Sequence, residues 1–398
     1  MIPSKLILTR YQNGILSTLM TNNRIEEISF CDNTDAEMLG NIYVAKVLNV
    51  VKNIHAAFID YQVGKRGFLP ISDKYKPILL NRTYDGRILA GDEILVQMEK
   101  DAIRGKEPVF TMNLSLSGKY CVITNANTTK SVSTKLNKID RDTLKLHIPV
   151  DTEYGIVVRT NAKELLVKED ITPFLSECQY CISQMDKILQ EGIHRTCFSK
   201  IYQAPASYLT EIRDNTSLQY EQIVTDDESL YEELQAFFHA YLPEKSDLLS
   251  FYADESLSLH KLYGMDTKLQ ELLQPKVWLP SGAYLVIEQT EAMYVIDVNS
   301  GKNITKKISD SYNLSINIEA AKEIMRQIRL RNLSGIIMVD FINMDTPSMN
   351  EQLLQELKKL AKLDRIQTTI VDMTPLGLIE ITRKKTKKSL KAQFSKKD

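Results

Sequence analysis

YLVIEQTEAMYVIDVNSG, residues 284–301, carries the clearest strand pattern in the C-terminal part of this sequence. Its two apolar runs, 284–288 and 293–298, are separated by polar residues and predict two strands. After these strands, we expect helices over residues 316–331 and 348–363, and further strands over 335–341, 369–373 and 378–382. Because strands alternate with helices, this part is predicted to be an α/β domain with a mixed sheet.

Two of the predicted strands end in an aspartate, Asp297 and Asp340. A carboxylate at the end of an apolar strand is costly unless something pairs with it, and ligand sites form at the carboxyl ends of strands in α/β sheets. If the two strands are neighbours, both carboxylates converge on one point, where hard oxygen ligands suit Mg²⁺ or Mn²⁺. Asn299 would orient the carboxylate or the substrate. The alternative is that each aspartate makes a turn or caps a helix.

The N-terminal half of the sequence is rich in short predicted strands. Three antiparallel strands are expected within residues 3–31, and the glycine corners of residues 39–119 suggest a small closed barrel. Phe58 and Phe68 flank a turn that contains two basic residues. Aromatic residues interleaved with basic ones can stack bases and meet phosphates. The alternative is that both phenylalanines belong to the core of the barrel.

A third pattern lies at the end of an apolar strand, where Arg159 and Thr160 place a guanidinium beside a hydroxyl. This pair suits a phosphate. The alternative is a surface arginine followed by a threonine that caps a helix. Farther along, residues 172–190 have helical periodicity and include Cys178 and Cys181. We interpret these two cysteines as buried or surface thiols rather than zinc ligands, because they would lie on one helix that must also bury apolar residues.

The amino-acid composition excludes several classes of protein. Of the 398 residues, 43% are hydrophobic and 25% are charged, which rules out wholesale disorder. The formal net charge of −1 excludes nucleic-acid binding by bulk positive charge, so basic groups that contact RNA or DNA must be grouped locally. We find no apolar run of about 18 residues and no signal peptide, so no transmembrane segment is expected. Five cysteines argue against a disulfide framework and favour a cytoplasmic protein.

Several segments resemble motifs of the ribonuclease E/G family, from near the N-terminus to about Arg383. Residues 284–301 are similar to the strand and D-V-N-S-G motif of its catalytic part. Further matches are residues 335–344 with its G-L-I-V-I-D-F-I-D-M segment, residues 377–383 with its closing G-L-L-E-x-[ST]-R, and residues 41–43, 56–61 and 67–70 with its S1-type barrel.

The resemblance implies an α+β multidomain fold. An RNase H-like subdomain would be split by an S1-type β-barrel and a 5′-sensor, and would be followed by a DNase I-like α/β catalytic subdomain. The implied boundaries are residues 1–36 and 208–279 for the two parts of the RNase H-like subdomain, 37–119 for the barrel, 120–207 for the 5′-sensor, 280–383 for the catalytic subdomain and 384–398 for a basic tail.

The resemblance also implies an activity and the residues that perform it. The activity is Mg²⁺-dependent endonucleolytic cleavage of single-stranded RNA in rRNA or mRNA processing and decay, stimulated by a 5′-monophosphate and leaving 5′-phosphate and 3′-hydroxyl products. Asp297 and Asp340 would hold the catalytic Mg²⁺, and Asn299 would assist through hydrogen bonds. The implied RNA contacts are Phe58, Phe68 and Lys106 for the single strand, and Arg159 and Thr160 for its 5′-monophosphate.

The family's C-x-x-C metal-link motif is missing beyond the catalytic part, where this sequence has a Lys-rich tail. We therefore expect no structural zinc and no zinc-linked tetramer, while a homodimer through other surfaces stays open. Two alternatives are a non-catalytic RNA-binding protein of the same fold and a metal-dependent DNA nuclease. The joint presence of Asp297, Asn299 and Asp340 counts against the first, and the aromatic residues of the barrel count against the second.

Overall fold

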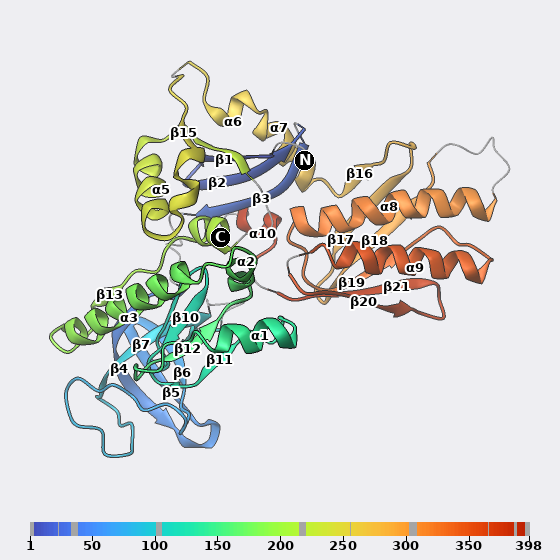
Figure 1. The fold of residues 1–398 in the computed structure, drawn as a ribbon. Coiled ribbons are helices and arrows are strands. Elements are labelled where there is room, and N and C mark those ends of the chain that lie inside the picture. Colours follow the sequence, from blue (N-terminus) through green and yellow to red (C-terminus); the bar gives the residue numbers. More distant parts are fainter. Residues whose placement is uncertain are drawn as a thin grey trace. The chain divides into compact units, whose positions relative to one another are not determined.

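The computed structural model describes residues 4–22, 24–32, 39–100, 106–214, 220–254, 256–301, 309–364, 366–385 and 388–394. Helices and strands are mixed along the chain, so the fold is of the α+β type, as expected (Figure 1). The chain divides into two units, of which the first comprises residues 1–34, 219–232 and 247–398 and the second residues 35–218 and 233–246. None of the described helices combines the length and apolar character needed to cross a membrane.

One sheet of the first unit joins two distant parts of the chain. Strands β1, β2 and β3 are antiparallel, as predicted, and β14 pairs in parallel with β1 and with β15. The turns before β2 and β3 contain Gln12 and Asn22, whose φ angles are 52° and 50°. The strands are β1 (Ser4–Tyr11), β2 (Gly14–Thr21), β3 (Arg24–Asp32), β14 (Tyr220–Thr225) and β15 (Leu249–Phe251). Three short helices contribute to the same core, α6 (Leu259–Leu262), α7 (Met265–Leu273) and α10 (Leu390–Phe394), together with Leu330.

The second sheet of the first unit has the order β16-β17-β18-β19-β21-β20. It is mixed, as predicted, because β18 and β19 are parallel and the other neighbours are antiparallel. Helices α8 and α9 lie along one face and bury its apolar side chains (Figure 1). The elements are β16 (Lys276–Trp278), β17 (Tyr284–Gln289), β18 (Met293–Asn299), α8 (Asp310–Leu330), β19 (Gly335–Asp340), α9 (Pro347–Ala361), β20 (Thr368–Met373) and β21 (Leu378–Arg383).

The other face of this sheet is open to solvent over much of its area. Residues alternate between the two faces of a strand, so those next to the buried ones point away from α8 and α9. Val295, Ile336 and Val371 are such residues, and their exposed fractions are 37%, 47% and 48%. We refer to this side of the sheet as the open face.

A closed barrel of five strands forms part of the second unit, consistent with an S1-like domain. Strands β4, β5, β6, β8 and β7 pair in this order, and β7 also pairs with β4, which closes the barrel. Tyr43, Tyr61 and Phe110 fill the interior with their rings in contact. Gly67 is required there, because a Cβ at this position would lie 2.4 Å from the Phe110 ring. The strands are β4 (Ile42–Val51), β5 (Ala56–Gln62), β6 (Lys65–Pro70), β7 (Glu93–Lys100) and β8 (Val109–Thr111), with β13 (Lys200–Tyr202) paired to β4 outside the closure.

A four-stranded sheet with the order β11-β12-β10-β9 completes the second unit, and we call it the small sheet. Helix α3 packs against it through Phe174, Cys178 and Cys181, which share a core with Cys121. The strands are β9 (Ser115–Ser117), β10 (Cys121–Thr124), β11 (Lys130–Val132) and β12 (Gly155–Val158). The helices are α1 (Lys138–Lys145), α2 (Lys163–Val167), α3 (Thr172–Gly192) and α4 (Ser207–Asp214), and the chain passes between the units within α5 (Glu228–Tyr241) and the short helix η3 (Pro243–Leu248).

Candidate functional site

Asp297 and Asp340 are direct neighbours in the sheet of the first unit. They are register partners on the parallel strands β18 and β19, whose backbones lie about 4.8 Å apart in such a pair. Ile296, Val298 and Val339 enter the core under the helices. The two aspartates therefore point to the open face, and both are exposed. The two strands are thus neighbours, which is the condition under which the two carboxylates were expected to converge.

Asn299 lies on the same face of β18 as Asp297, and the two side chains are joined by a hydrogen bond. The Nδ2 amide of Asn299 donates to Oδ2 of Asp297 over 2.7 Å. A neutral donor bound to one carboxylate oxygen restricts rotation of the carboxylate. The hydrogen bond from Asn299 therefore limits the orientations that the Asp297 carboxylate can take.

Helix α8 fixes the chain directly after Asp340. The Asn317 side chain is fully buried, accepts a hydrogen bond from the Ile342 N–H over 3.0 Å and donates one to the Ile342 carbonyl over 2.8 Å. Asn313 donates to the carbonyl of Asn343 over 3.0 Å. These contacts hold the end of β19 on the helix that connects it to β18. Sequence reasoning missed both asparagines, although polar residues on the apolar face of a predicted helix are a usable signal.

The donor set at Asp297 and Asp340 fits Mg²⁺. Two carboxylates in register offer hard oxygen ligands, and Mg²⁺ is commonly held by one or two carboxylates together with water and substrate phosphates. Within the described residues, no group of three or more His, Cys, Asp and Glu side chains is arranged to hold a metal ion. The pair would supply two protein ligands to such a cation, whose remaining positions would be filled by water or phosphate oxygens.

Phe58 and Phe68 lie on the outside of the barrel. They are register partners on β5 and β6, and their ring centroids are 5.8 Å apart with an angle of 68° between the planes. Both are half-buried, in contrast to the buried aromatic residues of the interior. Phe58 lines an open groove with a volume of about 450 Å³, together with Leu48, Asn49, Arg66 and Glu107. Lys106 is exposed and directly precedes Glu107 in the chain.

Arg159 is not the free surface arginine that its position in the sequence allowed. Its Nη1 and Nη2 donate to the two carboxylate oxygens of Asp214 over 2.7 and 2.8 Å, and Nη1 also donates to the Gly118 carbonyl. Burial opposes ionisation of Asp214, but the hydrogen bonds from Arg159 and Arg213 hold its pKa below the ordinary value. The hydroxyl of Thr160 is 3.0 Å from that of Ser133. The pair therefore lies in a polar network of the small sheet.

Glu177 on α3 organises the loop that receives Arg159. Its carboxylate accepts hydrogen bonds from the backbone N–H groups of Lys119, Tyr120 and Cys121. Gly118 leaves room for this carboxylate, because a Cβ there would lie 2.2 Å from the Glu177 carboxyl carbon and would displace it. Sequence reasoning missed Glu177 and Asp214. In the sequence, the one signal for this arrangement is Gly118 in the turn.

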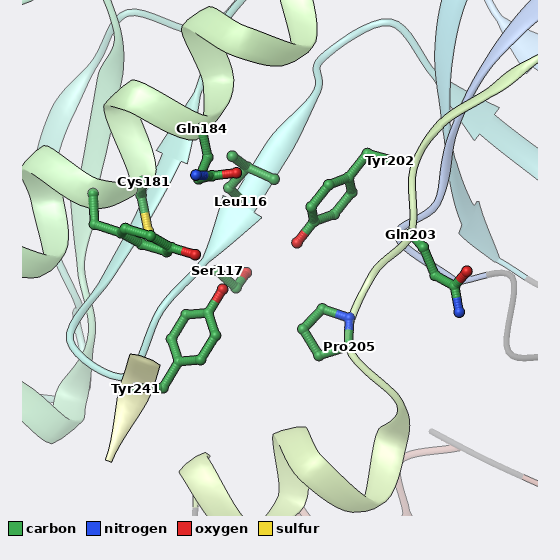
Figure 2. Close-up of a pocket in the computed structure, with 9 residues that line it drawn as sticks. Leu116, Ser117, Cys181, Gln184, Tyr202, Gln203, Pro205 and Tyr241 are labelled. Atoms are coloured by element: carbon green, nitrogen blue, oxygen red, sulfur yellow. The ribbon is translucent and has the colours of Figure 1, made fainter. Parts of the chain in front are cut away.

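A small polar pocket lies next to this loop in the second unit (Figure 2). Its volume is about 150 Å³. In Figure 2 the hydroxyl groups of Tyr202 and Tyr241 point into the space that Ser117 also faces. Burial raises the pKa of Tyr202 to about 12 and also raises that of Tyr241, so both hydroxyls are neutral donors near pH 7. No motif in the sequence indicated this pocket.

The chain is thus an α+β protein that combines an S1-like barrel with a pair of aspartates on the open face of a mixed sheet. The sequence model of the Ribonuclease E/G family matches residues 115–386, and the chain belongs to this family.

Individual relatives agree over most of the chain. Ribonuclease G of Salmonella typhimurium (strain SL1344) is 31% identical over 367 residues, which cover 89% of this chain and 74% of the relative. Ribonuclease G of Haemophilus influenzae is 29% identical over 400 residues, covering 97% of this chain and 80% of the relative. Ribonuclease E of Synechocystis sp. PCC 6803 is 32% identical over 372 residues, which cover 91% of this chain but 54% of the relative.

Proposed function

We propose that this chain is an endoribonuclease that requires Mg²⁺ and cleaves single-stranded RNA. The observation that carries the proposal is the pairing of Asp297 with Asp340 on adjacent parallel strands, with Asn299 hydrogen-bonded to Asp297. Membership of the Ribonuclease E/G family, and similarity to proteins named Ribonuclease G and Ribonuclease E, support the type of reaction.

Asp297 and Asp340 would hold the cation, with Mn²⁺ as the alternative to Mg²⁺. When bound, the cation would polarise the scissile phosphodiester and offset its charge. Asn299 keeps Oδ2 of Asp297 in one orientation through its amide. The open face admits a polynucleotide because both aspartates are exposed on it. Hydrolysis would break the bond between phosphorus and the 3′-oxygen, leaving a 5′-phosphate and a 3′-hydroxyl.

Preference for single-stranded RNA would come from the barrel. The outward rings of Phe58 and Phe68 can each stack on an unpaired base, which a duplex does not offer. Lys106 is exposed and can meet a phosphate. Because every base has a π-face, such contacts favour single strands without a strict sequence, which suits an enzyme of rRNA or mRNA processing and decay.

Stimulation by a 5′-monophosphate would come from Arg159 and Thr160. A guanidinium binds phosphate through paired hydrogen bonds, and the hydroxyl of Thr160 can add one. Asp214 already accepts two bonds from Arg159. A terminal phosphate must therefore share the guanidinium with this carboxylate or replace it.

The test is cleavage of a short 5′-monophosphorylated single-stranded RNA, with Mg²⁺ and with excess EDTA. We expect cleavage by the unaltered chain with Mg²⁺ alone, and loss of cleavage in Asp297→Asn and Asp340→Asn. Asp372→Asn is the matched control, since Asp372 is exposed on β20 of the same sheet.

Three outcomes would contradict the proposal. Full activity of both aspartate variants would exclude the metal site, and activity in EDTA would exclude dependence on Mg²⁺. RNA binding without cleavage by the unaltered chain would leave the non-catalytic RNA-binding protein as the function. Zinc analysis of the same preparation tests the expectation that no structural zinc is present. This expectation is supported by Cys178 and Cys181, which are buried together in a hydrophobic core.

A further inference from the structure

Lys276 and Trp278 bring a second group of side chains to the open face. Val277, between them on β16, packs toward the core under the helices, so its two neighbours point to the opposite side. Trp278 is 63% exposed. It is also the single tryptophan of the 398 residues.

The register connects this group with the paired aspartates. Trp278 lies opposite Tyr284, and Tyr284 lies opposite Asn299. In the next row of the open face, Lys276 is opposite Val286, which in turn is opposite Asp297. At about 4.8 Å between strands, β16 is about 10 Å from β18. A single strand of RNA bound at Asp297 would reach this group within a short length.

The three side chains form a cluster of two rings and one cation. The ring centroids of Trp278 and Tyr284 are 5.1 Å apart, with an angle of 59° between the planes. The Lys276 ammonium lies 4.0 Å from the Trp278 centroid and 3.7 Å from the Tyr284 centroid. A single exposed ring would be ordinary, but two aromatic rings that lie together on a solvent-exposed face, with a cation over both, form the kind of surface group that marks an interaction site.

We propose that Lys276, Trp278 and Tyr284 form a platform on which a nucleobase of the RNA stacks while the Lys276 ammonium meets a phosphate of the same strand. Base stacking on aromatic side chains with a cation beside them is the usual means of holding single-stranded nucleic acid. The platform rests on the proposed function of Asp297 and Asp340 and adds to it a contact that positions the strand.

An exposed aromatic surface could instead bind a second copy of this chain. The apolar part of the open face, with Val295, Ile336 and Val371, has the composition expected for such a contact. The platform differs from it because a cation lies over both rings, and a positive charge is complementary to phosphate. The charge therefore favours the polynucleotide.

The fluorescence of Trp278 provides a direct test, because no other tryptophan contributes to the emission. A single-stranded oligouridylate of ten nucleotides is added stepwise to the protein. The buffer contains EDTA, so the proposed reaction does not proceed. A ribose-phosphate oligomer of equal length without bases is the control probe. We expect saturable quenching by the RNA and none by the abasic oligomer.

Variants separate the contributions of the cluster. Lys276→Met is expected to weaken RNA binding, measured by anisotropy of a labelled RNA, and to lower its salt dependence by about one unit in slope. Tyr284→Ala is expected to weaken the same binding by about 5- to 150-fold. With Mg²⁺, Trp278→Ala should raise the KM for RNA by a similar factor and leave kcat near that of the unaltered chain. Leu376→Ala is the matched control, because Leu376 is 84% exposed and lies outside the cluster.

Two results would overturn the platform. One is a Trp278 emission that stays constant while labelled RNA saturates the protein. The other is quenching that depends on protein concentration in the absence of RNA, which would assign Trp278 to a contact between two copies. If RNA quenches the emission but the unaltered chain with Mg²⁺ cleaves no RNA, the platform stands and the proposed endoribonuclease function fails.

Discussion

Asp297 lies directly opposite Asp340 across the parallel pair β18–β19. Parallel neighbours require a crossover connection, and here the chain between them contains α8, whose Ala320 and Ile324 are buried in the same core as Ile296 of β18 and Val339 of β19. The helix also holds the segment after Asp340 through Asn317. The packing of one helix therefore places both carboxylates, which explains how residues far apart in the sequence form one site.

Asn299→Ala tests whether the orientation of Asp297 matters for the reaction. Loss of a hydrogen-bonding partner of a metal-binding side chain typically lowers metal affinity or activity by about 10- to 100-fold. We expect a loss of this size in kcat/KM, with a higher Mg²⁺ concentration needed for half-maximal activity. Thr382→Val, on β21 of the same open face, should leave both quantities unchanged. An equal loss in both variants would mean that Asn299 acts only through the stability of the sheet.

Phe58→Ala separates the RNA-contacting surface of the barrel from its core. Removing one stacking ring is expected to raise the KM for single-stranded RNA by about 5- to 150-fold, since stacking contributes about 1–3 kcal/mol per base. Phe58 is half-buried, so urea unfolding should change little. Phe110→Ala is the contrasting variant, because Phe110 is fully buried and its loss should cost about 3–5 kcal/mol of stability. An unchanged KM in folded Phe58→Ala would remove Phe58 from the proposed contacts.

The sequence was sufficient for features that depend on local periodicity. The apolar runs that end near Asp297 and Asp340 predict the two strands that carry them, and the short strands with glycine corners predict a barrel. It was insufficient where a polar side chain finds its partner through the fold. Arg159 and Asp214 are 55 residues apart, and neither lies in a pattern that identifies the other. Trp278 belongs to a strand of three residues, which is too short for its alternation to be recognised.

Asp364→Ala tests a buried ion pair that joins the end of β21 to the chain after α9. Arg383 Nε donates to Asp364 over 2.7 Å, and the two side chains are 3% and 2% exposed. Removing one partner of a buried pair costs about 3–5 kcal/mol, because the remaining charge has no counterpart. We expect this loss in the free energy of unfolding by urea. Lys359→Ala, which breaks an exposed pair with Glu356, should cost about 0–1 kcal/mol.

The same pair predicts how stability depends on pH. Burial opposes ionisation of Asp364, but Arg383 lowers its pKa below the ordinary value. The stabilisation is therefore complete above the pKa of an unfolded aspartate, about 3.9, and is lost as the pH falls through the lower value in the folded chain. Unfolding between pH 3 and pH 7 should show that the difference between the unaltered chain and Asp364→Ala shrinks only below about pH 4. A constant difference down to pH 3 would contradict this assignment.

Arg159→Ala and Asp214→Asn should change the response to the 5′ end of the RNA in opposite directions. Arg159→Ala removes the proposed phosphate contact, so RNA with a 5′-monophosphate and with a 5′-hydroxyl should be cleaved at equal rates. Asp214→Asn removes the carboxylate that occupies Arg159, so the KM for monophosphorylated RNA should fall while that for hydroxyl RNA stays constant. Asp142→Asn, exposed on α1, is the control for charge alone. If Asp214→Asn instead abolishes the preference, Asp214 holds Arg159 in place rather than competing with the phosphate.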